Sequence, residues 1–478
     1  MNFRMIRYIT GWLLVFEAIF MVVPSLTAVI YQEYSSIGWF LATMAGCLLV
    51  GGLMICRKPK STALYAKEGF VIVSLSWIVL SLVGSLPFFL SGVIPNYIDA
   101  LFETVSGFST TGASILPEVE SLPKCMLMWR SFTHWVGGMG VLVFIMAFVP
   151  LSGGHNMHIM KAESPGPSVS KLVPRIRTTA LILYAIYLAL TFIMFILLLC
   201  FGMSGFEALN TAFATAGTGG FGIKNDSMLS FSPALQIIVT VFMLLFSVNF
   251  SCYYLLLIGR FKDVFNAELK AFLVAVGVTI AVITLNVRHM FSSVGEALRH
   301  VAFSVASLVS TTGFATVDFN LWPAFSKTLL MLIMFMGACA GSTGGGIKVS
   351  RILIAVKGVG RDLGLMLHPH RVKKVMIDKR PLDNEVVRSV KVYLVTFSLV
   401  FAGSMILISF DNHDLVTNFT AVSAAMNNIG PGLENVGPTQ NYAFFSIPSK
   451  LVLIFDMLAG RLELFPMLLL FNPGTWKR

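Results

Sequence analysis

Charged residues are scarce in this 478-residue sequence, where Asp, Glu, Lys and Arg together make up only 12%. Soluble domains carry about twice that share, and no polar stretch here is long enough to form a second, water-soluble domain. Hydrophobic residues make up 56% of the chain and gather in runs of about twenty or more, the length that crosses the apolar core of a bilayer. The sequence therefore predicts an all-α polytopic membrane protein.

Cysteine is also sparse, and this excludes several kinds of site. The six cysteines are scattered, with neither metal-ligand spacing nor a disulfide framework. No cluster of His, Cys and carboxylates falls on one predicted membrane face, which argues against a membrane enzyme. The string Gly217–Gly222 matches a dinucleotide-binding pattern, but no strand precedes it, and Gly341–Gly346 is followed by Ile347 where a phosphate-binding loop requires lysine. We expect no nucleotide to bind this chain.

The net charge of +11 is unevenly placed. Lys348 to Lys391 holds eleven Lys and Arg against four Asp and Glu, and basic residues flank other apolar runs. Under the positive-inside rule these segments are cytoplasmic, as are both termini, so topology explains the surplus better than nucleic-acid binding. For His368–Arg371 and the basic run to Arg380, contact with lipid headgroups and docking of a soluble subunit both remain open.

A repeated event dominates the chain. Four 13-residue stretches (100–112, 208–220, 301–313 and 418–430) each read as a short apolar helix ending in a glycine segment. A tight turn would explain one of them, but four in equivalent places favour a ring of main-chain carbonyls that replaces the hydration shell of a cation. Glycine allows the required backbone angles at little steric cost. The candidate ligands are Thr110, Thr111, Gly112, Thr218, Gly219, Gly220, Thr311, Thr312, Gly313, Asn428, Ile429 and Gly430.

The apolar runs arrange these loops into four pseudo-repeated helix–re-entrant loop–helix units around one pore, after an N-terminal two-helix hairpin. The hairpin occupies residues 1–60, with spans at 9–31 and 36–56. The units occupy 61–160, 161–260, 261–380 and 381–478. Their spans are predicted at 68–93 and 126–150, 178–202 and 234–259, 271–291 and 323–357, and 391–410 and 446–471.

Two further features interrupt this pattern. Gly337–Gly346 is too rich in small residues to hold a lipid-facing helix well, and it forms either a close helix–helix contact or a flexible intramembrane loop. Arg461 lies about two-thirds through the last predicted span. An arginine at that depth usually faces the bundle interior or a cavity, and a structural ion pair is the alternative.

The four loops, together with Lys161–Pro167, Gly337–Lys348 and Met457–Pro466, resemble the Trk/Ktr/HKT superfamily of potassium uptake proteins, closest to the TrkH type. The resemblance covers nearly the whole chain. It implies potassium entry across a bacterial inner membrane, because in the superfamily glycine at all four loop positions accompanies potassium, whereas serine at the Gly112 position accompanies sodium. Asn428-Ile429 departs from the Ser-Thr-Thr-Gly pattern and predicts an asymmetric ring.

The resemblance also implies a gate and partners. Gly344, Gly345 and Gly346 would form a flexible gating loop beneath the filter, with Arg461 as a positive barrier. We expect K⁺ as the transported ion, lipid contact, a homodimer with one pore per protomer, and a cytosolic, nucleotide-binding, TrkA-like regulatory subunit. A proton- or sodium-coupled potassium symporter on the same scaffold is the alternative. The few acids expected at membrane depth count against it.

Overall fold

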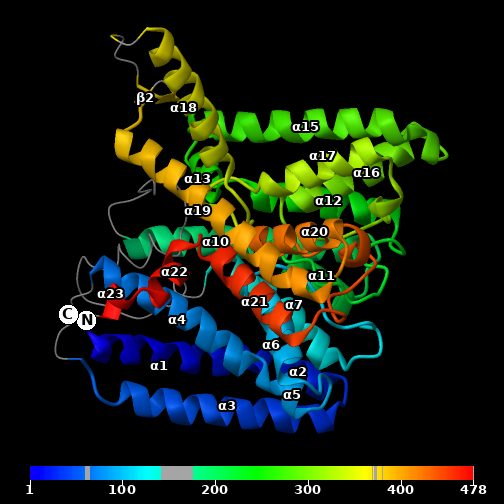
Figure 1. Ribbon diagram of the computed structural model, residues 1–478. Coiled ribbons are helices and arrows are strands. Elements are labelled where there is room, and N and C mark those ends of the chain that lie inside the picture. The colour runs from blue at the N-terminus through cyan, green and yellow to red at the C-terminus, as the bar shows by residue number, and fades with distance from the viewer. Residues whose placement is uncertain (60–64, 141–175, 369, 371–373, 379, 477–478) are drawn as a thin grey trace.

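The computed structural model describes residues 1–59, 65–140, 176–368, 370, 374–378 and 380–476, and Figure 1 shows them as a bundle of helices. Among the described residues, strands occur only in a small antiparallel hairpin that pairs β1 (Met376–Ile377) with β2 (Arg380–Pro381). The predicted all-helical class is therefore confirmed.

The N-terminal hairpin consists of α1 (Phe3–Phe20) and α2 (Val22–Ile30), which run as one apolar stretch, and α3 (Tyr34–Ile55). Two glycines bring its helices together: a Cβ atom on Gly51 would lie 2.8 Å from the Gly11 carbonyl oxygen. Small residues allow this close approach of backbones, and the predicted hairpin is present.

The rest of the chain follows the expected order of helices. Among the described residues between 65 and 260 the helices are α4 (Ala66–Gly84), α5 (Leu86–Leu90), α6 (Tyr97–Phe108), α7 (Lys124–Gly138), α10 (Ile176–Cys200), α11 (Gly205–Ala216), α12 (Pro233–Ser247) and α13 (Phe250–Leu257). From 261 onward they are α14 (Phe261–Val264), α15 (Ala267–Val287), α16 (Val294–Val309), α17 (Ala324–Phe335), α18 (Val349–Leu367), α19 (Asn384–Ile408), α20 (Leu415–Asn427), α21 (Ile447–Arg461), α22 (Phe465–Phe471) and α23 (Pro473–Trp476). Short 3₁₀ turns lie at Arg288–Met290, Phe319–Leu321, Ser409–Asp411 and Glu434–Val436.

Six stretches in the described part of the chain are long and apolar enough to cross a membrane, and a bent pair, α12 with α13, makes a seventh if counted as one span. The six are Phe3–Ile30, Tyr34–Ile55, Lys67–Leu90, Thr178–Cys200, Ala267–Met290 and Asn384–Asp411. The predicted span 126–150 begins with α7, but its part beyond Gly140 lies outside the described residues, as does the Lys161–Pro167 motif.

Three predicted spans are not continuous helices. The prediction of a continuous helix was wrong for 234–259 and 446–471, whereas the break within 323–357 falls at Gly337–Gly346, where the sequence predicted an interruption. The span 234–259 bends by 91° between α12 and α13, where the Asn249 side chain caps α13. The span 323–357 stops at Phe335 and resumes at Val349. The span 446–471 breaks after α21, because Glu463 (φ 54°) and Leu464 (φ 69°) leave the helical region. Hydropathy alone does not register such breaks, because the residues remain apolar.

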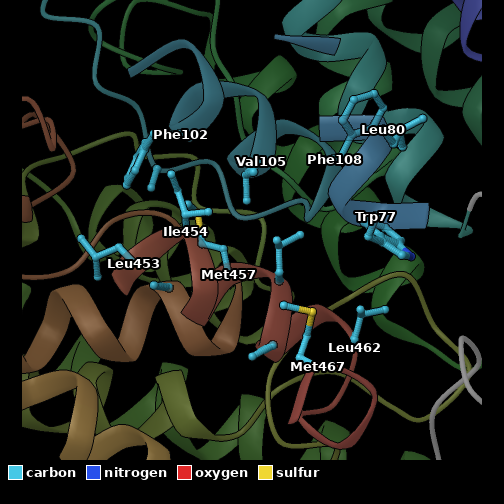
Figure 2. Packing of buried hydrophobic residues seen from close by; sticks show 14 of the residues in the cluster. Trp77, Leu80, Phe102, Val105, Phe108, Leu453, Ile454, Met457, Leu462 and Met467 are labelled. Carbon is cyan, nitrogen blue, oxygen red and sulfur yellow. The ribbon is translucent and has the colours of Figure 1, made fainter. Parts of the chain in front are cut away.

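The short helix α6 lies inside the bundle rather than at its edge. Figure 2 shows its side chains Phe102, Val105 and Phe108 packed with residues of α4, α21 and α22. The first and last quarters of the chain thus share one core, in which Trp77, Leu80, Leu453, Ile454, Met457, Leu462 and Met467 also take part.

Both ends of the described chain lie close together in Figure 1, near α1 and α23, and the α18–β2 region projects from the top of the same view. The Lys67 ammonium, at the start of α4, donates to the Gly474 carbonyl of α23 over 3.1 Å. This arrangement agrees with two termini on one side, and the cytoplasmic assignment of that side stays a prediction.

Candidate functional site

Four short helices, α6, α11, α16 and α20, each begin at a residue whose side chain caps the helix. Asn96 accepts from the Ile98 N–H, Ser204 from Glu207, Ser293 from Glu296 and Asp414 from Thr417. Such caps satisfy main-chain donors that have no partner within the helix. The capping residues therefore fix where each helix begins, and the length of the helix then fixes where the following loop begins.

The four loops that follow share one backbone pattern. We call residues 109–113 loop 1, 217–221 loop 2, 310–314 loop 3 and 428–432 loop 4. In each, the residue two before the glycine is left-handed, with φ 58° at Thr110, 55° at Thr218, 59° at Thr311 and 55° at Asn428. The glycines are left-handed as well, with φ from 78° to 93°.

The helix ends are closed identically in all four. The N–H of the residue before the glycine donates over 2.9 Å to the carbonyl oxygen five residues earlier. This bond and the left-handed residue form the usual C-terminal stop of a helix, in which glycine normally takes the left-handed place. The bonds are Thr111 to Ser106, Gly219 to Ala214, Thr312 to Ser307 and Ile429 to Ala424.

The loops close into a ring, which we call the glycine ring. A Cβ atom on Gly112 would lie 2.0 Å from the Gly219 carbonyl oxygen of loop 2, and one on Gly220 would lie 1.9 Å from that of Thr312 in loop 3. A Cβ atom on Gly313 would lie 2.2 Å from the Ile429 oxygen, and one on Gly430 would lie 2.7 Å from the Thr111 oxygen. Each glycine therefore packs against the equivalent carbonyl of the next loop, in chain order, and the fourth returns to the first.

A cavity of about 160 Å³ opens where the chain leaves the ring, and all four glycines line it. Among the described residues, its basic lining residues are Arg130 and Lys224, and no carboxylate lines it. The acids that the sequence places near the loops have other partners. Glu103 pairs with Arg130, Asp99 with Lys450, Glu434 with Lys327, and Asp411 accepts from Ser446.

At the opposite face of the ring, where the helices enter, residues 336–348 contact loops 3 and 4, and we call these residues the Gly-rich loop. The Gly345 N–H donates to the Thr311 hydroxyl over 2.7 Å. Cβ atoms on Gly344 and Gly345 would lie 2.9 Å from the Ser310 oxygen and 2.6 Å from the Asn427 oxygen. The candidate gate residues Gly344 and Gly345 therefore contact loops 3 and 4, and Gly346, with φ 72°, follows directly.

Arg461, the last residue of α21, links this Gly-rich loop to the end of α7. Its guanidinium donates to the Thr343 carbonyl over 2.8 Å and to the Gly137 and Gly138 carbonyls over 2.6 and 2.7 Å. The charge is thus held by main-chain oxygens at the face of the ring that the helices enter. Glu463, two residues on, pairs with Arg351 instead.

Loop 4 departs from the other loops chiefly in its side chains. The Asn428 amide donates to the Thr111 hydroxyl over 3.0 Å and to the Met457 carbonyl over 2.8 Å. In loops 1 and 3 a serine and a threonine hydroxyl pair over 2.7 Å instead. Asymmetry at Asn428-Ile429 is found in these side-chain bonds and in the spacing at Gly430, where the added Cβ atom would lie 2.7 Å from the next loop's carbonyl oxygen, against 1.9–2.2 Å at the other three glycines.

Sequence reasoning missed the residues that brace loops 1 and 2. His134 and Arg130, both buried on α7, contact the main chain of loop 2 and the residue after it. It also missed Lys348, whose ammonium donates to the Gly344 carbonyl. The available signal was a pair of polar side chains four residues apart in an apolar segment, a spacing that places both on one helix face.

Known proteins resemble this chain over its full length. The family model TrkH, described as a cation transport protein, matches residues 37–476. The Trk system potassium uptake protein TrkH of Escherichia coli (strain K12) is 37% identical, and that of Vibrio parahaemolyticus is 35% identical, with 100% of each chain covered. The crystal structure of the potassium transporter TrkH from Vibrio parahaemolyticus matches with a TM-score of 0.90 at 34% identity, again over 100% of both chains.

The family match covers far more than half of the chain, and it agrees with the apolar helices and the ring of glycine loops that the structure shows. The TrkH family is one of cation transporters rather than of enzymes, and its members cited above are named for potassium. This multi-pass membrane chain belongs to the TrkH family of cation transport proteins.

Proposed function

We propose that this protein takes up potassium ions, and that the glycine ring is its selectivity filter. The observation that carries the proposal is the closure of the ring, in which each of four glycines packs against the carbonyl of the next loop. Carbonyl oxygens from four loops can replace the water around a dehydrated cation. The relatives support potassium as the ion, since they are potassium uptake proteins.

The ligands we propose are the carbonyl oxygens of the twelve candidate residues in the four loops. When left-handed residues alternate with others, successive carbonyls point toward the same side of the chain. Non-glycine residues adopt the left-handed conformation only where the surrounding structure holds them in it. The hydrogen-bonded helix ends and the close packing of the loops supply that support. Non-helical backbone at this depth is tolerated only where it lines a cavity or is buried in protein.

We propose that flux is controlled on the inner side, by Gly344, Gly345, Gly346 and Arg461. The Gly-rich loop contacts loops 3 and 4 at the ring face that the helices enter, through the Gly345 N–H bond to the Thr311 hydroxyl and through close packing of Gly344 and Gly345. The Arg461 charge adds an electrostatic barrier to a cation that has passed the ring. Release of the guanidinium from the Thr343 carbonyl would free the Gly-rich loop from α7.

The four units, with boundaries at 61–160, 161–260, 261–380 and 381–478, are part of this proposal, as is the cytoplasmic placement of both termini in a bacterial inner membrane. We also propose a homodimer and a TrkA-like cytosolic subunit that binds nucleotide in place of this chain. Exposed apolar side chains on the projecting helix α18, among them Val356, Leu363 and Met366, support a protein contact there.

The test is rubidium tracer uptake into sealed liposomes that contain the purified protein, driven by a potassium gradient. Excess external potassium should block uptake, whereas sodium and lithium should compete weakly. Equal competition by all three cations would contradict a selective ring. A regulatory subunit would be supported by two results together. The isolated chain would give no flux, and liposomes that also enclose a cytosolic extract of the organism's cells would give selective flux.

A second candidate, a proton-coupled symporter, is favoured by one observation that the sequence analysis did not anticipate. Asp456 on α21 is fully buried, and one of its oxygens accepts the Ser404 hydroxyl over 2.7 Å. The other oxygen has no hydrogen-bond partner among the described residues. An ionisable side chain at membrane depth is a default candidate for a proton site. Uptake that needs a pH gradient, and loses that need in Asp456→Asn, would favour this candidate.

A further inference from the structure

We propose that His134 is a specificity-determining positioning residue, which sets the spacing between loops 1 and 2 of the glycine ring. The inference rests on the proposed function of that ring. It adds a side chain that need not touch the ion, yet controls how well the ring discriminates between cations.

His134 lies on α7 and touches both loops through its two ring nitrogens. Its Nδ1 lies 2.7 Å from the Gly107 carbonyl oxygen, in the last turn of α6 before loop 1. Its Nε2 lies 3.2 Å from the Phe221 nitrogen, immediately after Gly220. The imidazole therefore joins the entry of loop 1 to the exit of loop 2 through main-chain groups alone.

These two bonds define the state of the imidazole. The Phe221 N–H can only donate, so Nε2 must accept and carry no proton. The Gly107 carbonyl can only accept, so Nδ1 must carry the proton. The geometry thus assigns the neutral tautomer protonated at Nδ1, which serves as donor to loop 1 and acceptor from loop 2.

The imidazole also fills the space behind loop 2. A Cβ atom on Gly219 would lie 2.1 Å from Nδ1, and one on Gly217 would lie 2.1 Å from the His134 carbonyl oxygen. The Phe221 ring packs on the imidazole with centroids 4.3 Å apart. Loop 2 is therefore seated directly on this side chain, so a change there moves the Gly219 carbonyl, which faces Gly112.

One turn earlier on α7, Arg130 fastens the exits of the same two loops. Its guanidinium pairs with Glu103 of α6 over 2.8 Å and donates to the Gly222 carbonyl over 3.2 Å. Glu103 in turn accepts the Ile115 N–H over 3.0 Å. The ion pair holds the chain where it has left the ring, whereas His134 reaches the ring segments themselves.

Neighbouring loops elsewhere in the described chain are joined differently. Loops 2 and 3 are linked beyond their glycines by the Met228 N–H, which donates to the Ala315 carbonyl over 2.9 Å. Loops 4 and 1 are linked by the Asn428 side chain. An effect of His134 should therefore fall on the junction of loops 1 and 2.

The test compares two substitutions that each keep one ring nitrogen's role. Glutamine places an oxygen near the Nε2 position and can still accept from Phe221. Asparagine places its amide near the Nδ1 position and can still donate to Gly107, but it leaves the Phe221 N–H without an acceptor. The control is His300→Gln, because this other buried histidine bonds the Thr316 side chain and not a loop main chain.

We expect potassium-over-sodium discrimination in liposome uptake to stay near the wild-type value in His300→Gln and to fall about two- to threefold in His134→Gln, which loses only the bond to the Gly107 carbonyl. It should fall about tenfold in His134→Asn, because this variant leaves the buried Phe221 N–H without an acceptor, a loss of about 1.4 kcal/mol or more. Equal loss in both His134 variants, or loss in neither, would overturn the inference. Wild-type protein that does not discriminate would instead overturn the proposed function, which keeps the two failures apart.

A measurement on the wild-type protein covers the case in which His134→Asn does not fold. Nitrogen-15 NMR of histidine-labelled protein, with the His134 signal assigned by its absence in His134→Gln, reports which ring nitrogen is protonated. We expect a neutral ring protonated at Nδ1, with a shift of the Nε2 signal when sodium replaces potassium. A ring protonated at Nε2, or an Nε2 signal that does not respond to the cation, would contradict the proposal.

Discussion

Three threonines and one asparagine hold the left-handed position that ends each of the four short helices α6, α11, α16 and α20. Asparagine tolerates this conformation, whereas a β-branched residue such as threonine rarely adopts it. Strain of this kind costs on the order of 1–3 kcal/mol per residue and persists where neighbouring structure over-determines it. Thr110, Thr218 and Thr311 thus show that the packing around the ring, and not local preference, sets the backbone there.

The four glycines should differ in how badly they tolerate a side chain. We predict that alanine at Gly112, Gly220 or Gly313 reduces potassium-over-sodium discrimination by about tenfold or more, a change of about 1.4 kcal/mol. Alanine at Gly430 should have the smallest effect, because its nearest carbonyl lies 2.7 Å from the added carbon, against 1.9–2.2 Å at the other three. Competition of sodium with rubidium uptake measures the order, and a ranking with Gly430→Ala as the most damaging would contradict it.

The Glu103–Arg130 pair is almost completely buried, with exposed fractions of 0% and 2% for its side chains. We predict that Glu103→Leu destabilises the protein by about 3–5 kcal/mol, because it leaves a buried charge without its counter-charge. Adding Arg130→Met should recover part of the loss, since replacing both charges by apolar groups removes that penalty. Thermal unfolding in detergent measures both, and a double variant less stable than Glu103→Leu would argue against a charge effect.

Elements were predicted well where a period or a repeat carried the information. Glycine segments at four equivalent places located all the loops that form the ring, and the hairpin and outer helices follow from apolar length. The breaks were not predictable in this way. Asn249 caps α13 at a 91° bend, and Leu464, an apolar residue, takes φ 69° while its N–H donates to the Ala459 carbonyl.

The site was predictable in its main chain and only partly in its side chains. Arg461 and the Gly-rich loop stood out because an arginine and a run of glycines are unusual at membrane depth. The partners of Arg461 are carbonyl oxygens on α7 and in the Gly-rich loop, and a carbonyl has no sequence signal. His134 and Glu103 looked like ordinary polar residues until the fold brought them to the loops.

The link between α21 and the Gly-rich loop leads to a prediction about the gate. We expect Arg461→Gln to raise potassium flux, because both the charge barrier and the three carbonyl bonds are lost. Arg461→Lys should lie between Gln and wild type, because lysine keeps the charge but cannot present the planar fork of donors. Discrimination should change little in either variant. Flux is measured as initial uptake per protein, and lower flux in Arg461→Gln than in wild type would contradict the barrier.

For the whole molecule, the source of the driving force is the decisive property. We predict that uptake follows the potassium gradient and the membrane potential with no requirement for a pH gradient. Asp456→Asn should then leave the initial uptake rate unchanged within about twofold. If no transport step uses the carboxyl group, the substitution should change the activation free energy of transport by well below about 1.4 kcal/mol, the value of a tenfold effect. Liposomes loaded with defined buffers, with and without a protonophore, measure this. Loss of uptake on collapse of the pH gradient would favour coupling.

The packing order around the glycine ring follows the order of the chain, from Gly112 to Gly219, from Gly220 to Thr312, from Gly313 to Ile429, and from Gly430 back to Thr111. A single gene therefore encodes all four quadrants separately. In a pore built from four identical chains, any mutation appears four times at once. Here a mutation changes one quadrant while the other three stay constant. Ion preference can therefore change by one ligand position at a time rather than at four equivalent positions at once.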